Sequence, residues 1–93
     1  MIKTFADNET EKLFRRTFSK ILPQNIQLAA RMKLEILDAA EVFQDLRIPP
    51  GNLLERLSGD REGQHSIRIN DQGRICFVWR QENAHEVEIV DYH

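Results

Sequence analysis

The sequence predicts an α+β fold, in which two N-terminal helices pack on a small antiparallel β-sheet. Two observations lead to this prediction. Between residues 8 and 40 apolar residues recur at the spacing of an amphipathic helix, and between residues 63 and 92 they alternate with polar residues as in half-buried strands. A chain of 93 residues is long enough for one domain and too short for two, so residues 1–93 are expected to form a single domain.

The first predicted elements are a short strand and a helix. Ile2–Phe5 alternates between apolar and polar residues, which predicts a brief strand. Asn8 followed by Glu11 resembles a capping box and predicts a helix that begins at this point. One face of this helix is then expected to carry Leu13, Phe14, Thr17, Phe18 and Ile21.

A second helix is expected to have Pro23 in its first turn, where the missing N–H group is not needed. Two adjoining apolar stripes predict that this helix lies on a broad surface such as a sheet. The first stripe is Ile26, Ala30, Leu34 and Leu37, and the second is Met32, Ile36 and Ala40. The helical region is expected to end at Pro49–Asn52.

The sheet is predicted from a hairpin and a third strand. Residues 63–70 and 74–79 alternate on either side of Asp71-Gln72-Gly73, and Gly73 suits the left-handed residue that ends a three-residue loop. Such a loop would pair Asn70 with Arg74 and Arg68 with Cys76. Residues 87–92 predict the third strand.

The alternation separates the two faces of the predicted sheet. The apolar face, which the helices can cover, carries Ile67, Ile69, Ile75, Phe77 and Trp79. The other face carries Ser66, Arg68, Asn70, Arg74, Cys76 and Arg80. Since an antiparallel sheet can leave one face in water, the simplest interpretation of these arginines is a solvated face.

Composition and charge exclude several classes of protein. Hydrophobic residues make up 41% of the chain, which argues against disorder, and charged residues make up 30%, which argues against a membrane span. No apolar run approaches the roughly 20 residues of a spanning helix, and the first eight residues lack the apolar core of a secretory signal. We therefore expect a soluble, cytoplasmic protein. Because the net charge is −2, nucleic-acid binding would depend on where the arginines lie.

No metal or cofactor site is predicted. The one cysteine, Cys76, cannot form an intrachain disulfide, and the three histidines lie 20 and 8 residues apart along the chain. Neither a Cys-x-x-Cys pair nor a short histidine pair is present, so a structural zinc site is not expected.

The sequence ends in Asp91-Tyr92-His93, which could supply a proton acceptor and a proton donor. Arginine supplies planar, permanently charged donors for phosphate oxygens. Cleavage of RNA without a metal needs these parts: a base for the ribose 2′-OH, a cation for the phosphate and an acid for the leaving 5′-oxygen. The same residues also fit an ordinary charged chain end, and the pattern alone leaves both interpretations open.

Several blocks of the sequence resemble the HigB family of bacterial toxins. They are residues 57–72, with Gly59-Asp60-Arg61 near the start, then Arg74–Phe77 and Val87–His93. Met1–Phe5 and Leu46–Asn52 match as well, so the resemblance runs nearly end to end. HigB toxins belong to the RelE/ParE superfamily, and the resemblance implies its fold of two N-terminal helices on a small antiparallel sheet.

The resemblance also implies a function. HigB toxins are ribosome-dependent endoribonucleases that cleave mRNA in the A site and so inhibit translation. The implied partner is a HigA-like helix-turn-helix antitoxin, expected in a heterotetramer of two toxins and two antitoxins that binds operator DNA through the antitoxin.

The resemblance also implies roles for individual residues, at the positions where this sequence matches the HigB family. Arg74 would hold the scissile phosphate, and Arg68 would help to bind RNA. Arg61 would contact phosphate or ribosomal RNA, or only brace its turn with Asp60. The proton transfers would be performed or supported by Asp91, Tyr92 and His93. His93 is the better candidate for the base on its unperturbed pKa, but the choice stays open.

Three positions depart from the family pattern. Glu55 and Ser58 stand where members often carry histidine and lysine, and Gly73 stands where an aromatic residue is common. These departures predict weaker RNA affinity or slower cleavage. They also keep a second class open, a non-catalytic ParE-like protein that binds gyrase or acts mainly as a co-regulator with its antitoxin.

Overall fold

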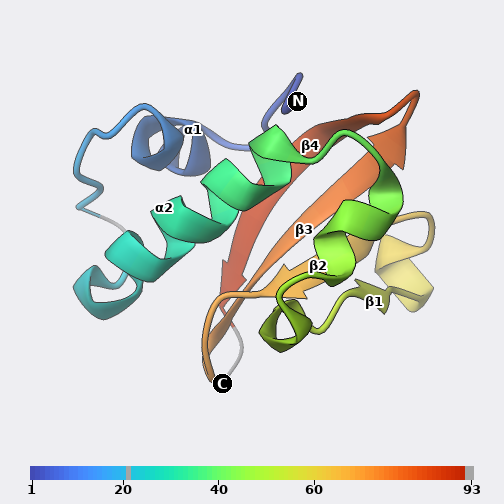
Figure 1. Cartoon of the computed structure of the whole chain (residues 1–93). Helices are drawn as coiled ribbons and strands as arrows, with labels where there is room; N and C mark the ends of the chain where they lie inside the picture. Colours follow the sequence, from blue (N-terminus) through green and yellow to red (C-terminus); the bar gives the residue numbers. More distant parts are fainter. Residues whose placement is uncertain (21, 92–93) are drawn as a thin grey trace.

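Two helices are followed by one antiparallel sheet, in the predicted order (Figure 1). The computed structural model describes residues 1–20 and 22–91. The helices are α1 (Asn8–Phe14) and α2 (Gln24–Ala39), and three short 3-10 segments follow at η1 (Phe43–Arg47), η2 (Pro50–Asn52) and η3 (Gly59–Arg61). The strands are β1 (Glu55–Arg56), β2 (His65–Arg68), β3 (Gly73–Arg80) and β4 (Asn83–Asp91), paired in that order. The predicted α+β class is confirmed.

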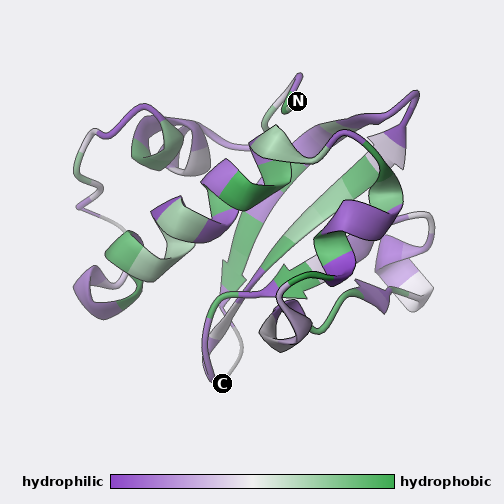
Figure 2. Cartoon of the chain, viewed as in Figure 1, coloured by the Kyte–Doolittle hydropathy of each residue, from purple (hydrophilic) through white to green (hydrophobic). Residues whose placement is uncertain are grey.

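The core lies between α2 and the sheet. The first predicted stripe is correct, because its four residues are all fully buried: Ile26, Ala30, Leu34 and Leu37. They meet the apolar face of the hairpin, where Ile67, Ile75 and Phe77 are also fully buried. Figure 2 shows hydrophobic residues along the strands that α2 crosses. Burying a large apolar side chain contributes roughly 1.5–3 kcal/mol, so this contact accounts for much of the stability.

The second predicted stripe of α2 is buried only in part. Met32 keeps 58% of its surface exposed and Ile36 is half-buried, whereas Ala40 is 6% exposed but lies just past the end of the helix. The reason is geometric, since a helix lying on one sheet buries a single stripe and turns the opposite side to solvent. In the described part of the chain, no helix has both the length and the apolar character that crossing a bilayer requires.

The N-terminal residues do not form a strand of their own. Ile2 and Phe5 make isolated parallel bridges to Ala84 and Val87 on β4. Between these bridges Glu86 has a left-handed backbone, with φ 52°, so the ladder is interrupted and the pairing stays discontinuous. The alternation therefore marks an extended segment that lies along β4.

The N-cap of the first helix lies one residue earlier than predicted. Asp7 is the N-cap, and its Oδ1 accepts a hydrogen bond of 2.8 Å from the backbone N–H of Thr10. The helix ends at Phe14, and Arg16 follows with a left-handed φ of 65°. The predicted apolar face is therefore wrong beyond Phe14. Thr17 and Phe18 lie after the helix, and Ile21 is outside the described residues.

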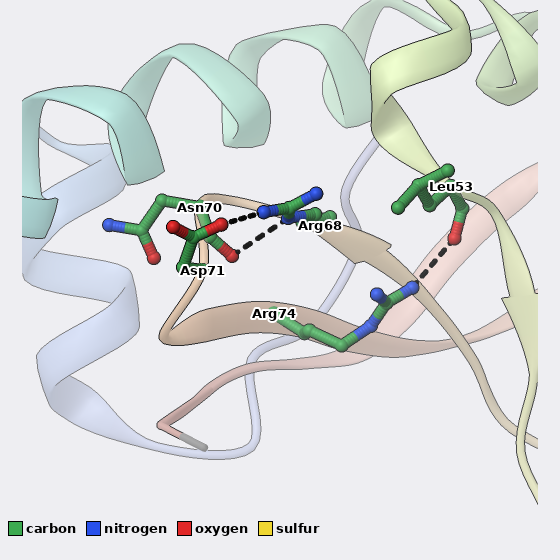
Figure 3. Close-up of a pocket in the computed structure, with 5 residues that line it drawn as sticks. All are labelled: Leu53, Arg68, Asn70, Asp71 and Arg74. Carbon is green, nitrogen blue, oxygen red and sulfur yellow. Dashed lines mark hydrogen bonds and ion pairs between the residues drawn. The ribbon is translucent and has the colours of Figure 1, made fainter. Parts of the chain in front are cut away.

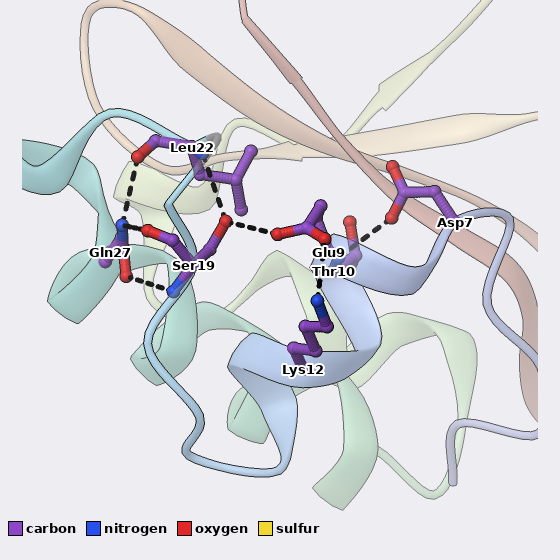
Figure 4. Close-up of polar contacts among 7 residues, drawn as sticks. All are labelled: Asp7, Glu9, Thr10, Lys12, Ser19, Leu22 and Gln27. Atoms are coloured by element: carbon purple, nitrogen blue, oxygen red, sulfur yellow. Dashed lines mark hydrogen bonds and ion pairs between the residues drawn. The ribbon is translucent and has the colours of Figure 1, made fainter.

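A polar network holds the connection between the two helices (Figure 4). The amide of Gln27 donates to the backbone oxygens of Ser19, at 2.8 Å, and Leu22, at 3.0 Å, while its Oε1 accepts from the Ser19 N–H at 3.2 Å. The Ser19 hydroxyl donates to Glu9 at 2.6 Å and accepts from the Leu22 N–H. The hydrogen bond from Ser19, with a smaller effect of Lys12, lowers the pKa of Glu9. The irregular chain after α1 thereby satisfies its buried polar groups.

The hairpin between β2 and β3 has a different register from the predicted one. Arg68 pairs with Arg74, and Ser66 pairs with Cys76, so the prediction is wrong by two residues. The loop is longer because the side chain of Asn70 accepts hydrogen bonds from the N–H groups of Gln72, at 2.8 Å, and Gly73, at 2.9 Å. An even shift preserves which side chains share a face, so the predicted faces survive the change of register.

Gly73 is not a left-handed loop residue. It is the first residue of β3 and is buried, and a side chain there would begin 3.4 Å from Ile69 and 3.6 Å from Ile26. Position 73 therefore faces the apolar core. The departure at Gly73 therefore does not remove an aromatic side chain from the polar face of the sheet, and it gives no reason to expect weaker RNA affinity.

Candidate nucleic-acid interface

Two rows of side chains cross the face of the sheet that points away from the helices. The first row runs over all four strands as Glu55, Ser66, Cys76 and Glu88, which are direct partners in the ladders. The second row contains Arg68, Arg74 and Val90. Antiparallel partners share a face, so these two rows define the polar surface on which a site could form.

Arg74 is held in place by neutral acceptors. Its Nε donates to the Ser66 hydroxyl at 2.7 Å, and its Nη2 donates to the carbonyl oxygen of Leu53 at 2.6 Å. Leu53 has a left-handed backbone at the end of η2, with φ 45°, which turns this carbonyl toward the strand. The carboxylate of Glu55 completes the surroundings, with Oε2 at 3.4 Å from Nη2. Only 14% of the Arg74 side chain is exposed, so the guanidinium is both oriented and partly sheltered.

Arg68 lies on the neighbouring strand and turns toward the hairpin loop. Its Nε donates to the backbone oxygen of Asn70 at 3.0 Å, and its Nη2 forms an ion pair with Asp71. The Arg68 side chain is 37% exposed, whereas that of Asp71 is 91% exposed. The loop therefore both positions this guanidinium and supplies its counter-ion.

A surface pocket of about 350 Å³ lies between these arginines (Figure 3). Its lining combines two guanidinium groups with polar loop residues and one apolar side chain: Leu53, Arg68, Asn70, Asp71 and Arg74. Paired guanidinium groups recognise phosphate or carboxylate oxygens, and an apolar wall suits the rest of a nucleotide. Chemically, the pocket can hold an anion that carries an apolar or aromatic group.

Arg61 does not line this pocket, and its side chain is engaged elsewhere. Its Nη1 donates to Gln64 at 3.0 Å and to Glu88 of β4 at 2.9 Å. The turn that carries it depends on left-handed glycines, with φ 65° at Gly59 and 92° at Gly63. Arg61 thus links its turn to β4 through Glu88, and its contact with phosphate or ribosomal RNA stays a prediction.

Asp91, the last described residue, does not extend the row that contains Arg68 and Arg74. Asp91 pairs with Gly73, whereas Val90 pairs with Arg74. By strand alternation Asp91 occupies the register position of the opposite face, at the last residue of β4. Tyr92 and His93 lie outside the described residues. The structure thus brings together two predicted residues, Arg68 and Arg74, and adds neighbours that the sequence analysis did not assign to the site.

Little or nothing in the sequence indicated that these added neighbours belong to the site. Glu55 was noticed only as a departure from the family pattern, and Asp71 only as part of a loop. Leu53 contributes a backbone carbonyl, which no side-chain pattern can indicate. Among the described residues, no three histidine, cysteine or acidic side chains gather as a metal site would require.

Comparisons with known proteins agree with this fold. Residues 3–93 match the family of the RelE-like toxin HigB of type II toxin–antitoxin systems. A Vibrio cholerae protein named Toxin HigB-1 is 52% identical over 60 residues, which cover 64% of this chain. An uncharacterized Haemophilus influenzae protein is 40% identical over 67 residues, which cover 72% of this chain. The matched part spans 63% of the length of each relative.

A solved structure provides an independent comparison of the fold. A chain of the YoeB–YefM complex from Staphylococcus aureus superposes with a TM-score of 0.58, over 100% of this chain and 98% of that one. The two sequences are only 13% identical, so the likeness concerns the arrangement of helices and strands.

Proposed function

The chain belongs to the HigB family of RelE-like toxins of type II toxin–antitoxin systems, and on this premise we propose that it is an endoribonuclease that cleaves mRNA in the ribosomal A site. The cleavage would need no metal and would inhibit translation and growth. The ribosome and its mRNA would be the target, which implies action in the cytoplasm.

The pairing of Arg68 with Arg74 is the observation that carries this proposal. Two guanidinium groups project from adjacent strands into one pocket, and Arg74 is oriented by acceptors that bear no charge. Donors that are fixed before the reaction stabilise charge that develops on a phosphate, since no reorganisation is needed in the transition state. Arg74 would hold the scissile phosphate, and Arg68 would bind the same or an adjacent phosphate.

The reaction would be a transfer within the RNA. A base removes the proton of the 2′-OH, the 2′-oxygen attacks phosphorus, and the bond to the 5′-oxygen breaks as an acid donates a proton to it. We assign these proton transfers to Tyr92 and His93, with His93 favoured as the base because imidazole titrates near neutral pH. Asp91, whose register position lies on the opposite face, would only support them. Arg61 would contact phosphate or ribosomal RNA, or would act indirectly by bracing its turn through Glu88.

The proposed partner is a HigA-like helix-turn-helix antitoxin. Membership of a toxin–antitoxin family supports an antitoxin partner, and the structurally similar Staphylococcus aureus chain was solved in the YoeB–YefM complex. We expect a heterotetramer of two toxins and two antitoxins that binds operator DNA through the antitoxin.

One observation favours a second candidate function. Both arginines of the pocket already face a carboxylate of the chain itself, and the net charge is −2. A ParE-like protein that binds gyrase, or a co-regulator that acts with its antitoxin, would tolerate such self-pairing better than a nuclease that must attract RNA.

Primer extension on translated message separates these functions. Purified protein is added to programmed ribosomes, together with Arg74→Ala, a chain that ends at Tyr92, and Arg80→Ala as a control at the exposed far end of β3. The proposal predicts cuts at A-site codons that the first two variants abolish and the control retains. Cuts that survive both variants would preserve the activity and refute the assigned site. Intact message, on ribosomes that a known A-site nuclease does cut, would favour the binding function.

A further inference from the structure

We propose that Glu55 and Asp71 are internal counter-ions of the Arg68–Arg74 pocket, which RNA phosphate must displace in order to bind. These two carboxylates would then set the affinity of the pocket for RNA. The inference rests on the proposed function for the identity of the ligand, and on the geometry of the pocket for the displacement.

The need for counter-ions follows from the register. Arg68 and Arg74 are direct partners on β2 and β3, and like charges in that position repel each other. Each arginine is matched by its own acid, Asp71 for Arg68 and Glu55 for Arg74. The four side chains together carry no net charge.

Glu55 reaches Arg74 across the intervening strand. Glu55 lies on β1 directly opposite Ser66 of β2, and the Arg74 guanidinium lies against the Ser66 hydroxyl at 2.7 Å. The carboxylate and the guanidinium therefore meet over Ser66, where their separation is 3.4 Å. The contact depends on the sheet register and not on proximity in sequence.

Each carboxylate is much more exposed than the arginine that it faces. Three hydrogen bonds to Ser66 and Leu53 fix Arg74 in addition to its ion pair. Glu55 is 60% exposed and Asp71 is 91% exposed, and exposed ion pairs are weak. If both acids swing into solvent, the arginines keep their positions and gain room for phosphate oxygens. A phosphate would then receive charge-assisted hydrogen bonds from donors that are already in place.

This arrangement has a consequence for selectivity. A pocket without net charge does not attract free RNA over long distances, because non-specific affinity comes mainly from uncompensated cations. RNA that is held at high local concentration, as in a ribosome, can still displace the acids. The internal counter-ions would thus restrict the protein to RNA that is presented to it.

Equilibrium binding tests the inference without any cleavage step. A fluorescently labelled, fully 2′-O-methylated RNA oligonucleotide is titrated with the wild type, Glu55→Gln, Asp71→Asn and the double variant. Glu41→Gln is the matched control, because it removes one exposed negative charge elsewhere and changes the net charge equally. We expect each single variant to bind about two- to fivefold more tightly, the double variant more tightly still, and the control to remain within error of the wild type. Adding Arg74→Ala to the double variant should remove the gain.

Two results would overturn the inference. One is an equal gain for Glu41→Gln, which would mean that only net charge matters. The other is unchanged or weaker binding in Glu55→Gln and Asp71→Asn, with thermal unfolding showing that both remain folded. Because no RNA is cut, this outcome is separate from that of the proposed function. If the wild type cleaves message but its variants show no gain in RNA affinity, only the counter-ion inference is refuted. If the variants bind RNA more tightly but the protein never cleaves message, only the proposed nuclease function is refuted.

Discussion

Arg68 and Arg74 are direct partners across the β2–β3 ladder, so that two cations face each other at the loop end of one hairpin. In an antiparallel sheet such a pair costs stability unless each charge is compensated. Here Asp71 compensates Arg68 and Glu55 compensates Arg74. The arrangement thus keeps two guanidinium groups side by side with no net charge on the four side chains, in a chain whose net charge is −2.

The proposed nuclease should be sensitive to replacement of Arg74 by lysine. The guanidinium donates from Nε to Ser66 and from Nη2 to Leu53, and one ammonium group cannot make both contacts while it holds a phosphate. We expect Arg74→Lys to lower the rate of A-site cleavage by about 10²-fold or more, the usual loss for a fixed transition-state donor. Arg80→Lys is the matched control. A rate within a few-fold of the wild type would mean that Arg74 acts only as a point charge.

An aromatic residue at position 73 should destabilise this chain. The Cβ of such a residue would begin 3.4 Å from Ile69 and 3.6 Å from Ile26, inside the packed core. Overpacking of this kind costs about 1–3 kcal/mol, so Gly73→Phe should unfold at a lower temperature than the wild type. Binding of the methylated oligonucleotide should not improve. Tighter RNA binding with an unchanged melting temperature would place the side chain on the other face.

The polar network after α1 should contribute measurably to stability. Replacing Gln27 by methionine keeps the volume but removes the hydrogen bonds that its amide makes with the backbone N–H and oxygen of Ser19. Ser19 is 1% exposed, and the loss of hydrogen bonds to a buried polar residue costs about 1–3 kcal/mol. Urea denaturation of Gln27→Met should show this loss, whereas Gln24→Met, at an exposed position of the same helix, should stay near the wild type.

The N-cap of α1 offers a comparison between adjacent residues. Asp7 accepts the hydrogen bond from Thr10, and Asn8 is already the first helical residue. Asp7→Ala should therefore lower the free energy of unfolding by about 1 kcal/mol, and Asn8→Ala should change it much less. The reverse order in denaturant melts would identify Asn8 as the cap.

His65 should make stability depend on pH below about 6.5. The centroid of its ring lies 4.8 Å from that of Phe43 and 6.3 Å from that of Phe77. Burial and, to a smaller extent, the charge of Arg56 lower the pKa of His65 from 6.5. The unfolded chain therefore takes up a proton near pH 6.5 that the folded chain resists, so stability falls as the pH drops from 6.5 toward the folded pKa. Denaturant melts over a pH series should show this slope, and His65→Phe should flatten it. An identical slope in the variant would assign the effect to other groups.

The family resemblance and the fold class could be read from the sequence because both depend on local patterns. Alternation in residues 63–79 assigned each side chain to a face of the sheet, and this assignment held although the hairpin register was wrong by two residues. The stripe from Ile26 to Leu37 likewise identified the buried side of α2. Errors arose where a single side chain decided the local geometry, as Asp7 does at the first helix and Asn70 does in the hairpin loop.

The sequence by itself determined the family, the order of the elements and the presence of Arg68 and Arg74 on one polar face, because periodicity and motif order are properties of neighbouring residues. Only the tertiary structure decided that these two arginines face each other, that Leu53 orients Arg74 through a backbone oxygen, and that Glu55 opposes its charge. Those relationships join residues that are up to 21 positions apart. They depend on how β1, β2 and β3 align and on where η2 ends, which hydrogen bonding and packing across the whole sheet determine.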